Sequence, residues 1–166
     1  MSDGSGNGSV GGGNGAAGVE PGRSPVETVR EFVEAVVWGE HQKVWDLMGV
    51  EARTTVLEVA SNRGMDEALA ARLRDGTAAA AERDDFLVDL VNGLRADLEG
   101  NDFDALRYEE DPERPEPGRA RVVIFVPAAF GPGGNLPVGS VELAAESSTT
   151  GEAEWRIERL VPQVSK

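Results

Sequence analysis

Apolar side chains recur along the first half of the chain with the period of an α-helix. Between residues 25 and 38 they are spaced three and four positions apart, at Val26, Val29, Val33, Val36 and Val37. Ser24 before this run and Glu27 three positions later match a capping box, and Gly39 follows as a stop signal. The pattern therefore predicts a helix from residue 25 to residue 38.

The same period predicts further helices over residues 40–48, 51–63, 65–74 and 77–98. Gly49 and Gly64 supply the stops of the first two. The last of these helices carries its apolar side chains on one stripe, at Phe86, Leu87, Leu90, Val91 and Leu94. Gly93 interrupts that stripe, so the final turns of this helix are expected to be its weakest part.

From residue 105 onward, apolar and polar positions alternate, which is the period of a β-strand. ALRYEED and RARVVIFVP, joined by the proline-rich turn PERPEPG, predict one antiparallel hairpin. SVELAAES and AEWRIERLVP, joined by STTGE, predict a second one. In the last strand, Trp155 and Ile157 should share one face, while Arg156 and Glu158 should share the other.

Helices followed by four antiparallel strands predict an α+β fold in which the helices cover one face of the sheet. Residues 24–162 are expected to form one domain. Residues 1–23 are dominated by glycine, with scattered serine and asparagine, so we expect a disordered tail. Residues 163–166 form a short C-terminal tail.

Charge restricts the possible partners. The chain of 166 residues has a formal net charge of −14, with 30 acidic against 16 basic residues. An acidic protein repels phosphate backbones and anionic lipid surfaces, so neither nucleic acid nor a membrane is an expected partner. No stretch approaches the roughly 18 to 20 apolar residues that cross a bilayer, so a cytoplasmic location is expected.

The supply of reactive side chains is small. With no cysteine and one histidine, the chain cannot form a disulfide, a thiolate metal site or a His-rich metal site, and it has no cysteine nucleophile. The Gly-rich loop AAFGPGGNLPVG matches neither GxxxxGK[ST] nor GxGxxG, the two common phosphate-binding patterns. No cofactor and no metal are therefore expected.

Two stretches, VETVREFVEAVVWGEHQKVWDLM near the start and EWRIERLV near the end, resemble the nuclear transport factor 2-like (NTF2-like) superfamily, which includes the SnoaL-like proteins. The resemblance covers about residues 25 to 162. It implies N-terminal helices packed in a curved four-stranded antiparallel sheet, forming a cone with a pocket at its open end. Many members place a short strand pair after the second helix, whereas residues 51–86 here have a helical pattern. The family includes isomerases, dehydratases, polyketide cyclases and non-catalytic domains, so the fold does not select a chemistry.

His41 is the first candidate for proton transfer, because an imidazole titrates near neutral pH. Asp46 is the second candidate base. If residues 40–48 are helical, these two side chains lie about 140° apart around the helix axis and cannot face each other. A solvent-facing His41 resting on Trp45 is the alternative interpretation.

Tyr108, the one tyrosine, should point from the first strand toward the helices, where its phenol would donate a hydrogen bond to a ligand oxygen. A buried tyrosine bonded to a backbone carbonyl is the alternative. Trp38, Trp45 and Trp155 are candidates for lining a pocket for a small apolar molecule, with Phe130 at the tip of the Gly-rich loop. Packing of the tryptophans in the core is the alternative.

Two functions remain open. The first is a non-catalytic domain that binds a small apolar molecule or another protein. The second is a SnoaL-like cyclase, dehydratase or isomerase, with His41 or Asp46 as the base and Tyr108 as the donor. The first is favoured, because the sequence lacks an Asp/His pair at helical spacing. Val123 and Phe125 lie on the opposite strand face from their apolar neighbours, so a homodimer through the open sheet face is also expected.

Overall fold

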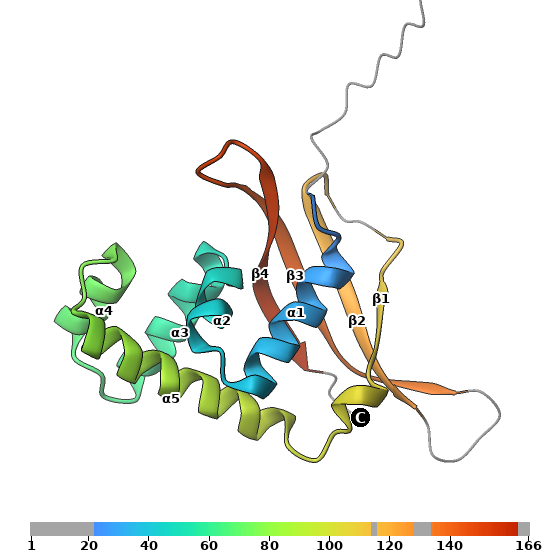
Figure 1. Cartoon of the computed structure of the whole chain (residues 1–166), viewed down its shortest axis with the longest axis horizontal. Helices are drawn as coiled ribbons and strands as arrows, with labels where there is room; N and C mark the ends of the chain where they lie inside the picture. The colour runs from blue at the N-terminus through green and yellow to red at the C-terminus, as the bar shows by residue number, and fades with distance from the viewer. Residues whose placement is uncertain (1–21, 114–115, 128–133, 163–166) are drawn as a thin grey trace, which may run out of the picture.

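A computed structural model describes residues 22–113, 116–127 and 134–162. Within these ranges, five α-helices and one 3-10 helix precede a four-stranded antiparallel sheet, which confirms the α+β fold (Figure 1). The predicted disorder of residues 1–23 falls almost wholly outside the described residues. Phe130 and the C-terminal tail, residues 163–166, also lie outside them.

The helices and strands follow the predicted order. The helices are α1 Pro25–Trp38, α2 His41–Leu47, α3 Val50–Asn62, α4 Glu67–Asp75, α5 Ala80–Leu98 and the 3-10 helix η1 Phe103–Ala105. The strands are β1 Arg107–Glu110, β2 Arg119–Pro127, β3 Asn135–Ser147 and β4 Ala153–Pro162.

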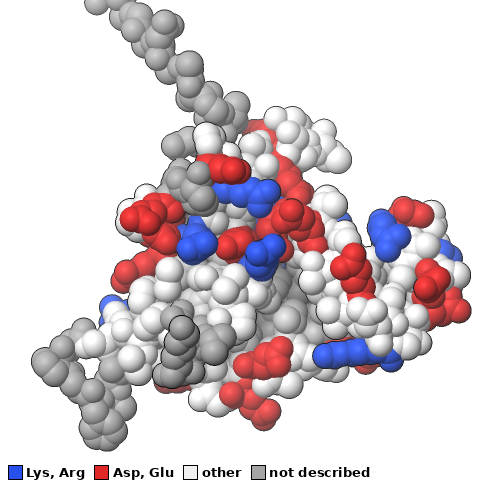
Figure 2. All heavy atoms as spheres, turned by 180° about the vertical axis from the view of Figure 1, so that it is seen from behind, with Lys and Arg blue, Asp and Glu red and all other residues white. Residues whose placement is uncertain are grey.

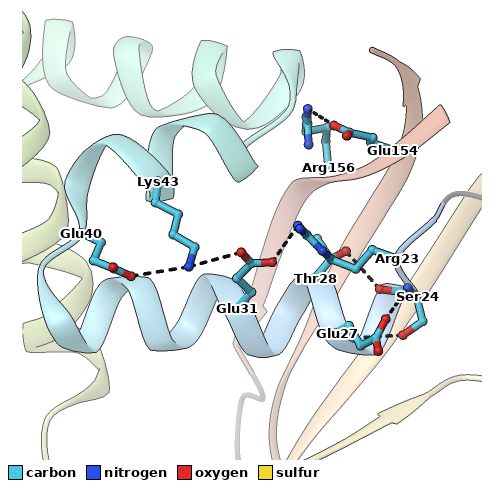
Figure 3. Close-up of polar contacts among 9 residues, drawn as sticks. All are labelled: Arg23, Ser24, Glu27, Thr28, Glu31, Glu40, Lys43, Glu154 and Arg156. Atoms are coloured by element: carbon cyan, nitrogen blue, oxygen red, sulfur yellow. Dashed lines mark hydrogen bonds and ion pairs between the residues drawn. The ribbon is translucent and has the colours of Figure 1, made fainter. Parts of the chain in front are cut away.

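Local signals at both ends fix the limits of α1. The Ser24 hydroxyl accepts a hydrogen bond from the Glu27 backbone N–H at 3.1 Å, and the Glu27 carboxylate accepts one from the Ser24 N–H at 2.9 Å (Figure 3). This reciprocal pair satisfies two of the free donors at the helix start. At the other end, Gly39 adopts a left-handed φ of 72°, which glycine reaches without steric cost.

The sheet has the order β1-β2-β3-β4, and α1 lies across one of its faces (Figure 1). The apolar side of α1 and the inward residues of the sheet form one core, whose central members are fully or almost fully buried: Val29, Val36, Val122, Val141, Leu143 and Ile157. The helices α2, α3, α4 and the start of α5 lie on the β4 side of α1, whereas η1 lies beside the start of β1 (Figure 1). Because core side chains fill the space between α1 and the sheet, the hollows described below lie among the helices.

β3 begins at Asn135, five residues earlier than Ser140, where the sequence pattern placed its start. The sequence pattern predicts a loop over residues 128–139 because of their glycines and prolines, and Pro137 is among them; proline cannot donate a ladder hydrogen bond. In the structure, Pro137 pairs with Phe125 beside a register shift, and the β4 ladder ends where Pro162 pairs with Gly139. Pro137 therefore lies beyond the part of β3 that pairs with the described residues of β4, and no carbonyl of that part of β4 needs a hydrogen bond from residue 137.

Glu158 also departs from the predicted alternation. Leu143 pairs with Ile157 and Glu142 pairs with Arg159, so Glu158 is the extra residue of a β-bulge. A bulge redirects the side chain of its extra residue, and Glu158 is only 7% exposed although it was expected to share a face with Arg156.

Crossing a bilayer takes about 20 mostly apolar residues in one helix, and no helix within the described residues meets that requirement.

Candidate functional site

The two candidate bases lie on α2 without facing each other. His41 is the first residue of the helix and is partly exposed, whereas Asp46, near the other end, is exposed. The Asp46 carboxylate accepts a hydrogen bond from the Gln42 side chain at 2.9 Å. Among the described residues, no hydrogen bond or ion pair joins His41 to Asp46, so this helix does not present them as an acid–base pair.

Tyr108 lies in a different part of the molecule, on β1 under α1. The Arg30 guanidinium sits 5.7 Å from the centre of its ring, a cation–π distance. Burial raises the pKa of Tyr108 to about 12, so the phenol stays protonated at neutral pH and can donate a hydrogen bond. Within the described ranges, no hydrogen bond or ring contact links Tyr108 to His41 or Asp46.

The three tryptophans do not meet around one pocket. Trp38 is 79% exposed at the end of α1, whereas Trp45 and Trp155 are buried in the core. The Trp45 ring packs edge-on against Phe86, with ring centres 5.8 Å apart, and the Arg53 guanidinium covers the Trp45 ring at 5.0 Å. Trp45 thus joins α2 to α3 and α5.

A groove between α3 and α5, to which Met65 just before α4 and Leu69 in its first turn also contribute, has a volume of about 630 Å³. We call it the helical groove. Its floor is formed by apolar side chains that are partly buried against the core: Val56, Met65, Leu69, Phe86, Leu90 and Leu94. Val59, which is 43% exposed, stands at its edge. Apolar hollows of this size, with a few polar groups at the margin, are typical ligand-binding or partner-binding sites.

The rim of the helical groove is acidic. It carries four acidic residues, Glu82, Asp85, Asp89 and Asp97, against the single arginine Arg63. Glu82 is engaged inside the chain, where it pairs with Arg72 at 2.8 Å, and the hydrogen bond from Arg72 lowers the Glu82 pKa. The three aspartates have no such partner within the described part of the chain.

A second hollow of about 410 Å³ lies where the end of α1 meets the end of α5 and η1. Val37, Leu98 and Phe103 supply apolar lining, and Arg95 and Glu99 supply opposite charges. Trp38 follows Val37 in the chain but does not line this hollow. The mixed charges give it no clear preference for one class of ligand.

The structure also reveals a carboxyl cluster that the sequence pattern did not predict. Glu146 accepts a hydrogen bond from the Val50 N–H, and Glu158 accepts one from the Glu51 N–H, both at 3.2 Å. These two N–H groups open α3, and Gly49 before them has no side chain that could cap the helix. The sheet therefore caps α3 with two glutamates from distant positions in the sequence.

Two effects raise the pKa of Glu158 to about 7: burial is the larger, and a hydrogen bond with the Glu146 side chain is the second. A carboxyl group that titrates near neutral pH is a recognised sign of a functional site. Here both carboxyl groups are occupied as helix caps, and neither lines the two hollows described above. We therefore assign Glu146 and Glu158 a structural role.

No cluster of three or more His, Asp or Glu side chains that suits a metal ion occurs among the described residues. Comparison of the chain with protein families, with curated proteins and with solved structures found no match.

Proposed function

We propose that this chain is a non-catalytic binding domain of the NTF2-like kind, and that the helical groove is its binding site. The observation that supports the proposal is the composition of the groove, a hollow of about 630 Å³ with an apolar floor. Such a floor favours the binding of an apolar molecule or the apolar side of a protein, because binding removes its surface from water.

The enzyme alternative has less support. A general base and a donor act on one substrate only when both lie within hydrogen-bond reach of it. His41 and Asp46 are on α2, whereas Tyr108 is on β1 under Arg30, and none of the three lines the helical groove. The SnoaL-like cyclase, dehydratase or isomerase would need these side chains at one cavity.

A neutral fluorescent dye such as Nile red tests the proposal, because its emission rises when it enters an apolar site. We expect saturable binding at one site, weakened at least about fivefold by Val59→Asp, which places a charge at the edge of the groove. Val88→Asp is the matched control, because Val88 is on α5, is also 43% exposed and does not line the groove. Equal dye binding by wild type and both variants, or no binding by wild type, would contradict the proposal.

A homodimer through the outer face of the sheet is a second part of the proposal. The apolar outer residues Val123, Phe125 and Val161 lie at one end of this face, and Val161 is 37% exposed. Beside them, Glu142 pairs with Arg121 at 3.1 Å and with Arg159 at 4.0 Å. Figure 2, which shows the molecule from behind, has charges of both signs gathered above an uncharged area. An apolar patch with a charged rim is the usual composition of a protein interface.

A further inference from the structure

The side of α5 that faces the helical groove carries two parallel rows of residues. Phe86, Leu90 and Leu94 form an apolar row at intervals of four, and all three line the groove. Asp85, Asp89 and Asp97 form an acidic row beside it, in which Gly93 occupies the remaining position. Residues four apart lie on the same side of a helix, so each row runs along the groove.

The acidic row has no evident role in folding this chain. Aspartates four positions apart on one helix repel each other. Glu82, at the start of the same helix, is held by Arg72, but Asp85, Asp89 and Asp97 make no side-chain ion pair or hydrogen bond within the described ranges. The row therefore offers free negative charge along one edge of an apolar hollow.

Gly93 also lacks a role in the isolated chain. It lies inside α5, where glycine is unfavourable, and it does not adopt the positive φ that would require glycine. A methyl group added to it would meet nothing within 4 Å, so no neighbour of this chain needs the space. A glycine at the wall of a groove allows the backbone of a partner to approach closely.

We propose that the helical groove binds a basic amphipathic helix of a partner protein, which crosses α5 at Gly93. This inference rests on the proposed function and names the class of partner. The apolar side of the helix would cover Phe86, Leu90 and Leu94, while its lysines or arginines would pair with the three aspartates. The acidic row spans twelve helical steps, or about 18 Å, which a partner helix of roughly 12 to 15 residues matches.

Segments of the same chain fit the groove less well. Residues 1–22 contain no lysine or arginine, and Arg23, the last residue of the tail, pairs with Glu31 of α1 at 2.6 Å, so the N-terminal tail has no free basic side chain to complement the rim. A second copy carries the same net charge of −14, which opposes its approach to an acidic surface. Charge complementarity therefore favours a different, basic partner.

The test uses three labelled amphipathic peptides of about 15 residues. Each has the same leucine face, and its polar face carries lysine, glutamine or glutamate. Fluorescence anisotropy measures the dissociation constant of each peptide for the full chain. We expect the lysine peptide to bind about tenfold more tightly than the glutamine peptide, because each exposed ion pair contributes a few-fold.

The triple variant Asp85→Asn/Asp89→Asn/Asp97→Asn should abolish the preference for lysine over glutamine. A matched triple variant, Glu58→Gln/Asp75→Asn/Asp84→Asn, removes three exposed acids that do not line the groove and should retain the preference. Equal loss in both variants would identify a nonspecific effect of net charge and overturn the inference.

Gly93→Ala should weaken binding of the lysine peptide at least about fivefold, because the added methyl group blocks the close approach of the peptide backbone to α5. Unchanged peptide affinity in Gly93→Ala would overturn the proposed crossing point. A groove that binds the dye but does not distinguish the three peptides would support the proposed function and overturn the basic helix. If the wild type does not bind Nile red, the proposed function itself is contradicted.

Discussion

Gly49 is required by its neighbours rather than by its own backbone. Its φ of −81° is open to any residue, but a Cβ placed there would overlap the Glu158 carboxylate and lie 2.8 Å from the Glu146 Oε1. Both carboxyl groups are fixed by hydrogen bonds to the start of α3. The missing side chain is thus what allows two glutamates to reach the helix end.

We therefore predict that Gly49→Ala lowers the free energy of unfolding by about 1 to 3 kcal/mol, the usual cost of overpacking a filled site. Urea denaturation measures the change. Gly93→Ala is the matched control, because a Cβ there enters open space, and it should raise stability by up to about 1 kcal/mol through better helix propensity. Equal effects of the two substitutions would show that the carboxyl groups move aside at no cost.

At the scale of elements, the attachment of the start of α3 to β4 should depend on pH, because it involves the Glu158 carboxyl group. The Gly49 N–H donates to the Ile157 carbonyl at 2.7 Å, and the Glu158 carboxyl lies against the first turn of the helix. The pKa of Glu158 rises from 4.5 to about 7 on folding, so the folded state holds that proton more tightly than the unfolded chain. This contribution to stability is complete below pH 4.5 and is lost as the pH rises toward 7.

We expect the free energy of unfolding of the wild type to fall between about pH 5 and about pH 8, by at most roughly 3 kcal/mol from this group. Glu158→Gln keeps an acceptor for the Glu51 N–H and cannot ionise, so its stability should change much less over this range and exceed that of the wild type at about pH 8. Glu152→Gln, an exposed residue before the same strand, controls for the loss of net charge. Parallel pH curves for the wild type and Glu158→Gln would contradict the assignment.

At the scale of elements, the sequence predicted what depends on local signals. The capping box at Ser24, the stop at Gly39 and the helical period lie within the segments that they define, and the corresponding helix was confirmed. The start of β3 and the bulge at Glu158 depend on where a neighbouring strand ends or slips. The residue pattern of one strand does not show where the neighbouring strand ends or shifts register, so the sequence pattern missed the start of β3 and the bulge at Glu158.

The candidate site shows the same division. The apolar stripe on α5 was visible in the sequence, but the sequence did not show which of its members face the core, because a period of 3.6 gives the face of a helix without showing what covers it. Leu87 and Val91 are indeed buried, whereas Phe86, Leu90 and Leu94 are only partly covered and form the groove floor. Which members of the stripe are covered depends on how α5 packs against the other helices, and no pattern within α5 itself gives that packing.

For the whole molecule, net charge and apolar surface act in opposite directions on self-association. Each copy carries a charge of −14, which repels a second copy at low salt. Val123 and Phe125 on the outer face of the sheet favour contact, because their burial removes apolar surface from water. The balance between the two effects should therefore depend on ionic strength.

We predict a homodimer whose dissociation constant falls as salt rises from about 0.05 M to about 0.5 M, since salt screens the repulsion between exposed charges and leaves the apolar contact in place. Sedimentation equilibrium over a range of protein concentrations measures this constant. Phe125→Asp should raise it at least about tenfold, because the carboxylate would be buried at the interface without a partner. Val88→Asp, with the same added charge at an exposed position on α5, should leave it nearly unchanged. A chain that stays monomeric at high salt and high protein concentration would show that the outer face of the sheet does not bind a second copy.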